Sequence, residues 1–329
     1  MSEKTVCTTV FPLNNGTNLP AVGLGTWQGN GSTKDHNEVR DSIIHALRSG
    51  YRLIDTAQHY HVEPAVGEAV RLSGIPRNEI TIITKFWGHW HHDPAQALQI
   101  SLDALGLDYI DVFLMHWPNA ATPDNGEYLP ITASPTYIET WRLMEKCVGD
   151  QCRAIGVSNF SQKLLDELLA ATTIVPAVNQ VELHAFNPNL RSVPYCHEKG
   201  IQVMSWSTMG GGGDHVPKGK EIITDPFFKR IAANHECSTG VLALSWAVQR
   251  GICVIPKSSS LSRIEENLRL VTLTEKEMSE MNEAHLTLGK LRLADHIDSV
   301  KGERDGKLTI MNWTNQDFGW EDAEGNWLA

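Results

Sequence analysis

Short hydrophobic runs rich in β-branched and aromatic residues recur along this chain and alternate with segments of helical pattern. The run at residues 110 to 116 is apolar on both faces, which predicts a parallel strand buried on both sides. Helical patterns such as residues 38 to 49 and 161 to 171 separate these runs. Eight parallel strands with intervening helices close into a (β/α)8 barrel. The predicted strands are residues 21 to 26, 52 to 57, 80 to 85, 110 to 116, 152 to 158, 177 to 182, 201 to 207 and 252 to 256.

The 329 residues are expected to form one domain, because barrels of this kind often run to about 250 residues or more as one unit. We predict that residues 8 to 20 form a β-hairpin, which turns at Asn15 and Gly16. The barrel is expected to span residues 21 to 289, and a C-terminal loop and tail to span 290 to 329.

Three segments are too long to be simple connections: residues 118 to 137, residues 210 to 225, and the tail from about residue 290. Long loops on a barrel usually build a binding pocket, so we expect these segments on the face where the strands end. The tail carries Trp313, Trp320 and Trp327, which are costly to leave in water. We therefore expect the tail to pack over the structure.

Composition and charge exclude several classes of function. Hydrophobic residues make up 41% of the chain and charged residues 20%, and the formal net charge of −11 argues against a nucleic-acid partner. The first residues lack an apolar signal region, and no stretch of about 18 apolar residues occurs, so we expect a cytoplasmic protein with no membrane partner. The six cysteines form no CxxC pair, which argues against a zinc or disulfide framework.

Polar, titratable residues end three consecutive predicted strands. Asp55, Lys85 and His116 stand at these ends, and Tyr60 follows Asp55 by five residues. The C-terminal ends of barrel strands meet at one mouth, so these side chains are expected to converge there. A lysine or histidine beside an apolar core is costly unless it is paired or used. The sequence therefore predicts a shared active site.

The residue types at this site indicate proton transfer. Tyrosine is a weak acid, and we expect the Lys85 cation to lower the pKa of Tyr60 while Asp55 keeps Lys85 charged and oriented. His116 can donate a hydrogen bond to a substrate oxygen or orient it. The set contains no nucleophile with an attached base and no metal cluster, so a cofactor has to supply the attacking species. A hydride delivered to a carbonyl carbon fits this set.

Several motifs of this chain resemble those of the aldo-keto reductases. The similar stretches are residues 50 to 57, GYRLIDTA, with Tyr60 and Glu63 following; 83 to 85, ITK; 107 to 118, LDYIDVFLMHWP; 156 to 160, GVSNF; and 255 to 258, IPKS. The resemblance covers most of the chain, and its pattern looks most like the glycerol dehydrogenase and aldehyde reductase branch. It implies a (β/α)8 barrel, a nicotinamide cofactor extended across the mouth, and the reduction of aldehydes or ketones.

The resemblance also implies roles for individual residues. Tyr60 would be the general acid, Lys85 and Asp55 its tuning pair, and His116 the orienting residue. NADPH/NADP+ is the implied cofactor, because Lys257, Ser258 and Arg263 match the family positions that clasp the 2′-phosphate. The predicted cofactor-binding residues are Thr26, Trp27, Asp55, Ser158, Asn159, Gln180, Trp206, Ser207, Lys257, Ser258, Ser259, Arg263, Glu266 and Asn267. Among these, Ser158, Asn159 and Gln180 would hydrogen-bond the nicotinamide carboxamide, while Glu266 and Asn267 would face adenine.

Two positions depart from the family pattern. Trp206 stands where the family usually has a tyrosine against the nicotinamide, and Val62 stands where asparagine is common. Stacking is retained at position 206, but the phenol is lost.

Aromatic residues that follow the predicted strand ends are expected to line a largely apolar pocket for a small carbonyl substrate. The predicted pocket residues are Trp27, Trp87, His116, Trp117 and Phe160. His89, His91 and His92 are the local cluster most suggestive of a metal, but adjacent histidines point apart and no cysteine completes a set, so we predict no metal and place them at a pocket rim or surface loop.

Two other local patterns are discounted. The glycines of residues 23 to 29 imitate a dinucleotide fingerprint, and residues 195 to 199 imitate the Tyr-xxx-Lys pair of another dehydrogenase class, each without the rest of its fold.

Alternatives to a general carbonyl reductase remain open at this point. One is a tailoring reductase of natural-product biosynthesis that acts on one larger ketone, which the long loops would permit. Another is a binding module, since some proteins of this fold serve as potassium-channel β subunits that keep the cofactor as a sensor. About twenty residues precede the first predicted barrel strand, which is short for such a subunit. We expect a monomer.

Overall fold

The computed structural model describes residues 5–29, 35–124, 126–211 and 216–328. Its first feature is the predicted hairpin, in which β1 (Val10–Pro12) pairs antiparallel with β2 (Asn18–Pro20). The turn forms at the predicted place, where Gly16 has a φ of 85° that favours glycine. Leu19 is fully buried, so the hairpin directs an apolar side chain into the protein.

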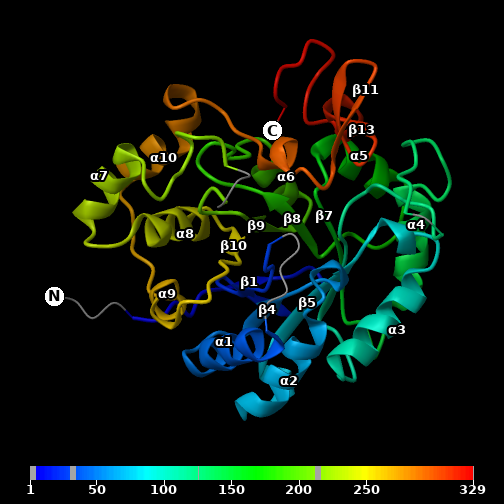
Figure 1. Cartoon of the computed structure of the whole chain (residues 1–329), viewed down its shortest axis with the longest axis horizontal. Helices are drawn as coiled ribbons and strands as arrows, with labels where there is room; N and C mark the ends of the chain where they lie inside the picture. Colours follow the sequence, from blue (N-terminus) through cyan, green and yellow to red (C-terminus); the bar gives the residue numbers. More distant parts are fainter. Residues whose placement is uncertain (1–4, 30–34, 125, 212–215, 329) are drawn as a thin grey trace.

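The central element is a parallel sheet of eight strands, which are neighbours in the order in which they occur along the chain. Each strand is connected to the next through helical segments, as expected for a βα succession. Figure 1 shows the strands in the middle of the molecule with helices around them. The strands are β3 (Leu24–Gly25), β4 (Leu53–Asp55), β5 (Thr81–Phe86), β6 (Val112–Met115), β7 (Ile155–Ser158), β8 (Val178–Glu182), β9 (Gln202–Trp206) and β10 (Cys253–Val254).

The sheet closes on itself between its first and last strands. Val22 and Val254 form a parallel bridge, and the Gly23 N–H donates to the Val254 carbonyl at 2.8 Å. A side chain at Gly25 would place its Cβ 2.6 Å from the carbonyl oxygen of Ile255, so only glycine allows this close approach. The predicted (β/α)8 barrel is confirmed, although β3 and β10 are shorter than predicted because the closing contacts are irregular.

The helices surround the sheet, and several of them begin at a polar side chain that caps the first turn. The helix predicted at residues 38 to 49 starts two residues earlier, because the Asp35 side chain accepts a hydrogen bond from the N–H of Asn37. The pattern at residues 161 to 171 forms α5, whose N-cap is Ser161. The barrel helices are α1 (His36–Arg48), α2 (Glu63–Ser73), α3 (Pro94–Leu105), α4 (Tyr137–Met144), α5 (Gln162–Ala171), α6 (Ser192–Glu198), α7 (Pro226–Asn234), α8 (Thr239–Gln249), α9 (Leu261–Glu266) and α10 (Glu275–Thr287).

Strand alternation places the predicted site directly above the barrel interior. Five interior residues, Leu53, Ile83, Leu114, Val178 and Met204, belong to one buried cluster, which the hairpin residue Leu19 joins. Side chains two positions apart on a strand point to the same face. Each interior residue is therefore followed, on the same face, by a residue of the predicted site: Asp55, Lys85, His116, Gln180 and Trp206.

The C-terminal segment is more ordered than the loop and tail that we predicted. It forms an antiparallel sheet of β11 (Lys301–Arg304), β12 (Lys307–Ile310) and β13 (Trp313–Thr314), followed by α11 (Asn315–Phe318). Figure 1 shows this sheet beside α5 at the top of the view.

Tryptophan side chains and polar contacts hold the tail against the barrel. The indole N–H of Trp313 donates to the Leu129 carbonyl, and the Arg292 guanidinium lies over the rings of Trp320 and Trp327. At the start of the tail, the N–H groups of Leu293 and Ala294 donate to the Glu182 carboxylate. The expected packing of the tail is confirmed. The predicted loop at residues 210 to 225 includes residues 212–215, which lie outside the described residues.

Replacing Leu19 with alanine should destabilise the barrel by about 2–5 kcal/mol, because the substitution leaves a cavity in an interior that has little room to collapse. The free energy of unfolding in urea measures the loss. Val10→Ala is the matched control in the same hairpin, since Val10 is 50% exposed, and it should change stability by less than about 0.5 kcal/mol. Equal small losses of stability in both variants would contradict the contribution of Leu19 to the buried cluster inside the barrel.

Candidate active site

A buried ion pair lies at the centre of the barrel mouth. The Lys85 Nζ donates to Asp55 Oδ1 at 2.7 Å and to the carbonyl of Thr56 at 2.9 Å, and the exposed fractions of Lys85 and Asp55 are 0% and 1%. The other Asp55 oxygen accepts a hydrogen bond from Gln180 Nε2 at 2.7 Å. Burial lowers the pKa of Lys85 and raises the pKa of Asp55, while their attraction opposes both shifts. Each group therefore compensates for the buried charge of the other.

Tyr60 ends the short 3-10 helix η1 (Gln58–Tyr60), which follows β4 and brings the phenol ring over the lysine. The Lys85 Nζ lies 5.0 Å from the centre of this ring. The expectation of a lowered Tyr60 pKa is wrong: burial raises this pKa well above its ordinary value, and the Asp55 charge raises it further. Lys85 gives its hydrogen bonds to Asp55 and Thr56 and not to the phenol. Tyr60 is therefore protonated at neutral pH.

His116 lies directly after β6 and faces Tyr60 edge-on, with the two ring centres 5.6 Å apart. Burial lowers the pKa of His116 well below its ordinary value, and the charge of Lys85 lowers it further, so the imidazole is neutral near pH 7. Its Nδ1 is buried and has no hydrogen-bond partner among the described residues. Nε2 is thus the ring nitrogen that can meet a substrate. A protonated phenol and a neutral imidazole stand side by side.

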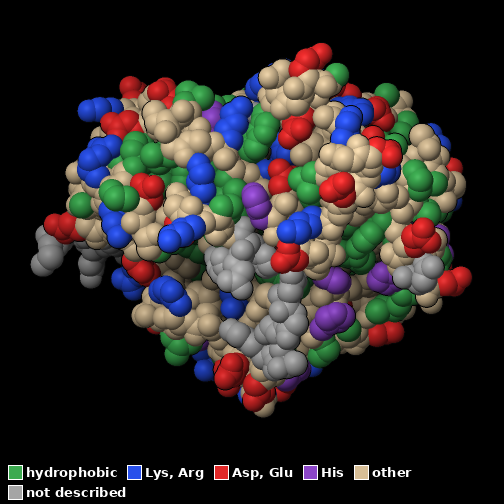
Figure 2. All heavy atoms as spheres, turned by 45° about the horizontal axis from the view of Figure 1, so that its top comes forward, with side chains coloured by type: hydrophobic (Ala, Val, Ile, Leu, Met, Phe, Trp, Pro, Cys, Tyr) green, Lys and Arg blue, Asp and Glu red, His purple; other side chains and the backbone are tan. Residues whose placement is uncertain are grey.

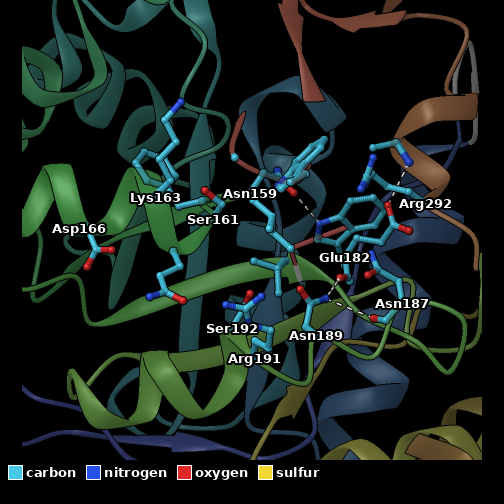
Figure 3. Close-up of a pocket in the computed structure, with 18 residues that line it drawn as sticks. Asn159, Ser161, Lys163, Asp166, Glu182, Asn187, Asn189, Arg191, Ser192 and Arg292 are labelled. Atoms are coloured by element: carbon cyan, nitrogen blue, oxygen red, sulfur yellow. Dashed lines mark hydrogen bonds between the residues drawn. The ribbon is translucent and has the colours of Figure 1, made fainter. Parts of the chain in front are cut away.

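The residues predicted to hold the nicotinamide form one hydrogen-bonded chain at the ends of β7, β8 and β9. Ser158 Oγ donates to the Gln180 carbonyl at 2.7 Å, and Asn159 Nδ2 donates to the His116 carbonyl at 3.0 Å. The Trp206 indole N–H donates to Asn159 Oδ1 at 2.9 Å, a contact that Figure 3 also shows. Since Gln180 also bonds Asp55, this chain connects the ion pair to Trp206. Asn159 has a φ of 65°, a conformation that concentrates at functional sites.

The residues predicted to bind the 2′-phosphate lie together after β10. Lys257, Ser258 and Ser259 precede α9, which carries Arg263 on its exposed side. Arg263 makes no ion pair with any residue that the structure describes, although the protein carries a net charge of −11. An exposed guanidinium without such an ion pair, close in the chain to a lysine and two serines, belongs to a set of donors that suits a phosphate dianion. The remaining predicted cofactor residues lie nearby in the chain or at the mouth: Glu266 ends α9, Asn267 is its buried C-cap, Ser207 follows β9, and Thr26 bonds the Asp55 carbonyl.

The predicted pocket residues separate into two groups. Trp27 contacts the Tyr60 ring and Trp87 contacts the His116 ring, each with ring centres 4.9 Å apart. Trp117 instead packs against Phe318 and Trp320 of the tail. Phe160 is buried against Tyr137 at a centre distance of 5.5 Å. The structure therefore brings Trp27 and His116 against the Tyr60 ring and Trp87 against His116, whereas Trp117 and Phe160 pack against other aromatic side chains.

A cavity of about 260 Å³ lies beside Asn159, Phe160 and Trp206. Figure 3 shows the polar side chains around it, which come from α5, the segment before α6, the end of β8 and the start of the tail. The sequence did not single these residues out, since no local pattern connects segments so far apart. They include Lys163, Glu182, Asn187, Asn189, Arg191 and Arg292.

The histidine cluster is divided by the fold. His91 is fully buried and its Nε2 lies 3.1 Å from the Trp117 carbonyl, so its predicted place at a rim or surface loop is wrong. His92 is exposed and His89 is half-buried. Within the described residues, no group of three or more histidine, cysteine, aspartate or glutamate side chains could hold a metal ion. No helix in the described parts of the chain has the length and apolar character needed to cross a membrane.

Comparisons with known proteins identify the family to which this barrel belongs. The model of the aldo/keto reductase family matches residues 21–285. The chain is 36% identical over 324 residues to glycerol 2-dehydrogenase (NADP(+)) of Saccharomyces cerevisiae, which covers 93% of this chain and 96% of that relative. It is 37% identical over 300 residues to an aldehyde reductase of the same yeast, with 86% and 93% covered.

A solved structure gives the same result. The crystal structure of a Bombyx mori aldo-keto reductase in complex with NADP matches with a TM-score of 0.79 at 33% identity, covering 88% of this chain and 95% of that one. This chain belongs to the aldo/keto reductase family.

Glu63, to which the sequence analysis assigned no role, is a second buried acid beside the ion pair. It is the first residue of α2, and its Oε1 accepts a hydrogen bond from Thr84 Oγ1 at 2.6 Å. Burial raises the pKa of Glu63 to about 7, although the hydrogen bond from Thr84 and the nearby Lys85 charge oppose the shift. The folded protein therefore holds a proton on Glu63 in a pH range where the unfolded chain has lost it.

This difference predicts a pH-dependent loss of stability. The pKa of Glu63 rises from 4.5 in the unfolded chain to about 7 in the fold, so stability falls as pH rises through this window and stays reduced above it, by up to about 3 kcal/mol. Glu63→Gln should remove this part of the pH dependence. Urea unfolding at pH 5 and pH 8 measures it, with Glu68→Gln in the same helix as control. An unchanged pH trend in Glu63→Gln would contradict the assignment.

Proposed function

We propose that this protein reduces the carbonyl group of aldehydes or ketones to an alcohol, with NADPH as the hydride donor and Tyr60 as the proton donor. The observation that carries the proposal is the grouping of a protonated Tyr60, a neutral His116 and the buried Lys85–Asp55 pair at one mouth. Such a set can donate and position protons but cannot attack a carbon atom. The similarity to an NADP(+)-dependent glycerol 2-dehydrogenase and to an NADP-bound structure supports the cofactor.

The chain's own residues would handle the substrate oxygen. NADPH supplies the hydride. Tyr60 gives its phenolic proton to the carbonyl oxygen, and His116 Nε2 hydrogen-bonds the same oxygen and orients it. Because the pKa of Tyr60 is raised, its proton moves only as the oxygen becomes strongly basic in the transition state. The Lys85 ammonium, 5.0 Å from the ring centre, would offset part of the negative charge that develops on Tyr60, against the opposing effects of burial and Asp55.

The cofactor would extend from the chain of Ser158, Asn159 and Gln180 to the cations after β10. Amide and hydroxyl groups suit the neutral carboxamide, and the indole of Trp206 offers a face for the nicotinamide ring. Lys257, Ser258 and Arg263 would hold the 2′-phosphate. We propose a monomer as the working unit. Trp27 and Trp87 form a tryptophan wall beside Tyr60 and His116. This wall supports small carbonyl compounds as substrates.

The first experiment follows the loss of NADPH absorbance with a panel from glyceraldehyde to aromatic aldehydes and bulky ketones. We expect oxidation of NADPH by several small aldehydes. Tyr60→Phe should lower kcat by about 100-fold or more while NADPH binding stays nearly intact, because only the transferred proton is removed. Near-normal turnover by Tyr60→Phe would refute the assigned acid. Tight NADPH binding without turnover of any panel member would favour a dedicated larger ketone or a sensing role.

Arg263→Ala tests the phosphate site. The substitution removes a charge-assisted hydrogen-bond donor, so the Kd for NADPH should rise roughly tenfold or more while the Kd for NADH changes little. Quenching of tryptophan fluorescence measures both constants. Arg269→Ala removes another exposed arginine close in the chain and should affect neither. Equal losses for the two cofactors in Arg263→Ala would show that the phosphate site is misassigned.

A further inference from the structure

Among the described residues, His59 is the titratable side chain that stacks on Trp27 and Trp87 beside Tyr60 and that the proposed mechanism leaves without a role. Its imidazole ring is nearly parallel to the indoles of Trp87 and Trp27, with interplanar angles of 14° and 13° and centre distances of 4.1 Å and 6.2 Å. Stacking occupies the faces of a ring. The edge of the imidazole, which carries both nitrogens, is what remains for hydrogen bonding.

The same two indoles contact the groups that face the carbonyl oxygen. Trp27 packs on Tyr60 and Trp87 packs edge-on against His116. The Trp87 indole N–H also donates to the Tyr128 hydroxyl at 3.1 Å, which fixes its orientation. The Trp27 indole therefore contacts both His59 and Tyr60, and the Trp87 indole contacts both His59 and His116.

The backbone fixes the same arrangement. His59 and Tyr60 are consecutive residues of η1, and this turn is anchored by Gln58, whose Nε2 donates to the Ala97 carbonyl at 2.7 Å and to Ser101 Oγ at 3.1 Å. A rigid turn keeps the imidazole at a constant distance from the phenol. A polar atom on the imidazole edge thus has a defined position relative to the carbonyl that Tyr60 protonates.

The imidazole has hydrogen-bonding capacity to offer. His59 is half-buried, and its ring nitrogens make no hydrogen bond to any residue in the described ranges. Figure 2 shows histidine side chains close together on one face of the molecule. Burial lowers the pKa of His59, and the neighbouring His61 and His89 lower it further, so the ring is neutral near pH 7. A neutral imidazole has one donor and one acceptor, which matches a hydroxyl group better than a carboxylate.

We propose that His59 is a specificity-determining residue that favours carbonyl substrates with a hydroxyl group close to the carbonyl, such as 2-hydroxyaldehydes. The proposal rests on the reductase function proposed above. The imidazole edge hydrogen-bonds the substrate hydroxyl while Tyr60 and His116 hold the carbonyl oxygen. An otherwise aromatic wall would not distinguish such a substrate from its deoxy analogue.

The test compares D-glyceraldehyde with propanal, which has the same carbon chain without the hydroxyls. His59→Phe keeps an aromatic ring for stacking but removes both nitrogens. The ratio of kcat/KM for glyceraldehyde to kcat/KM for propanal should fall about fivefold relative to the wild type, the loss expected for one neutral hydrogen bond. Differences in hydration and reactivity between the two aldehydes cancel, because the ratios are compared between enzymes. His59→Gln, which restores a donor and an acceptor, should recover part of the preference.

His92→Phe is the matched control. His92 stacks on Trp90 with ring centres 5.9 Å apart but lies outside the wall beside Tyr60, so its loss should leave the ratio unchanged. An unchanged ratio in His59→Phe, with both substrates turned over, would overturn the role of His59 and leave the reductase function intact. A wild-type protein that oxidises NADPH with neither aldehyde, nor with any other carbonyl of the panel, would overturn the proposed function itself.

Discussion

The buried pair of Lys85 and Asp55 is the constraint on which the mouth of the barrel depends. Removing two charges from water costs several kcal/mol per ion, and only well-placed partners offset that cost. Here Asp55 and the Thr56 carbonyl bind the ammonium, and Gln180 binds the second carboxylate oxygen. These contacts link β4, β5 and β8. A one-residue slip of β5 would turn Lys85 out of the barrel, so the pair and the strand register require each other.

The same pair explains why the phenol stays protonated in the resting protein. A lysine free to bond Tyr60 would stabilise phenolate already in the ground state, and the proton donor would be lost at neutral pH. With its hydrogen bonds directed at Asp55 and Thr56, Lys85 offsets only part of the cost of a phenolate, and burial and the Asp55 charge keep the pKa of Tyr60 raised. The attraction between Lys85 and the charge on Tyr60 grows as the proton leaves, so it is stronger in the transition state than in the ground state, and such an interaction raises a rate.

The polar residues at the strand ends could be predicted from the sequence. A titratable side chain directly after a run buried on both sides is costly unless it is paired or used, so its presence indicates a site. The sequence predicted other features poorly for definable reasons. A run without alternation does not reveal which side chains point inward, so the contact of Gln180 with Asp55 was hidden. His91 looked like a rim residue because its burial depends on the distant Trp117 carbonyl. The tail is held by contacts of Trp313 with Leu129 and of Leu293 with Glu182, and both partners lie more than a hundred residues earlier in the chain.

The residues proposed for proton transfer and those proposed to select the substrate are held by different parts of the fold. The reacting groups stand on or next to strands of a closed sheet, where register fixes them. The wall of Trp27 and Trp87 depends in part on a long segment instead, because the Trp87 indole donates to Tyr128 of the connection after β6. Changes in that segment can move the wall without moving Lys85 or Asp55. Substrate range can therefore diverge between relatives while proton donation is preserved, because the two rest on different parts of the fold.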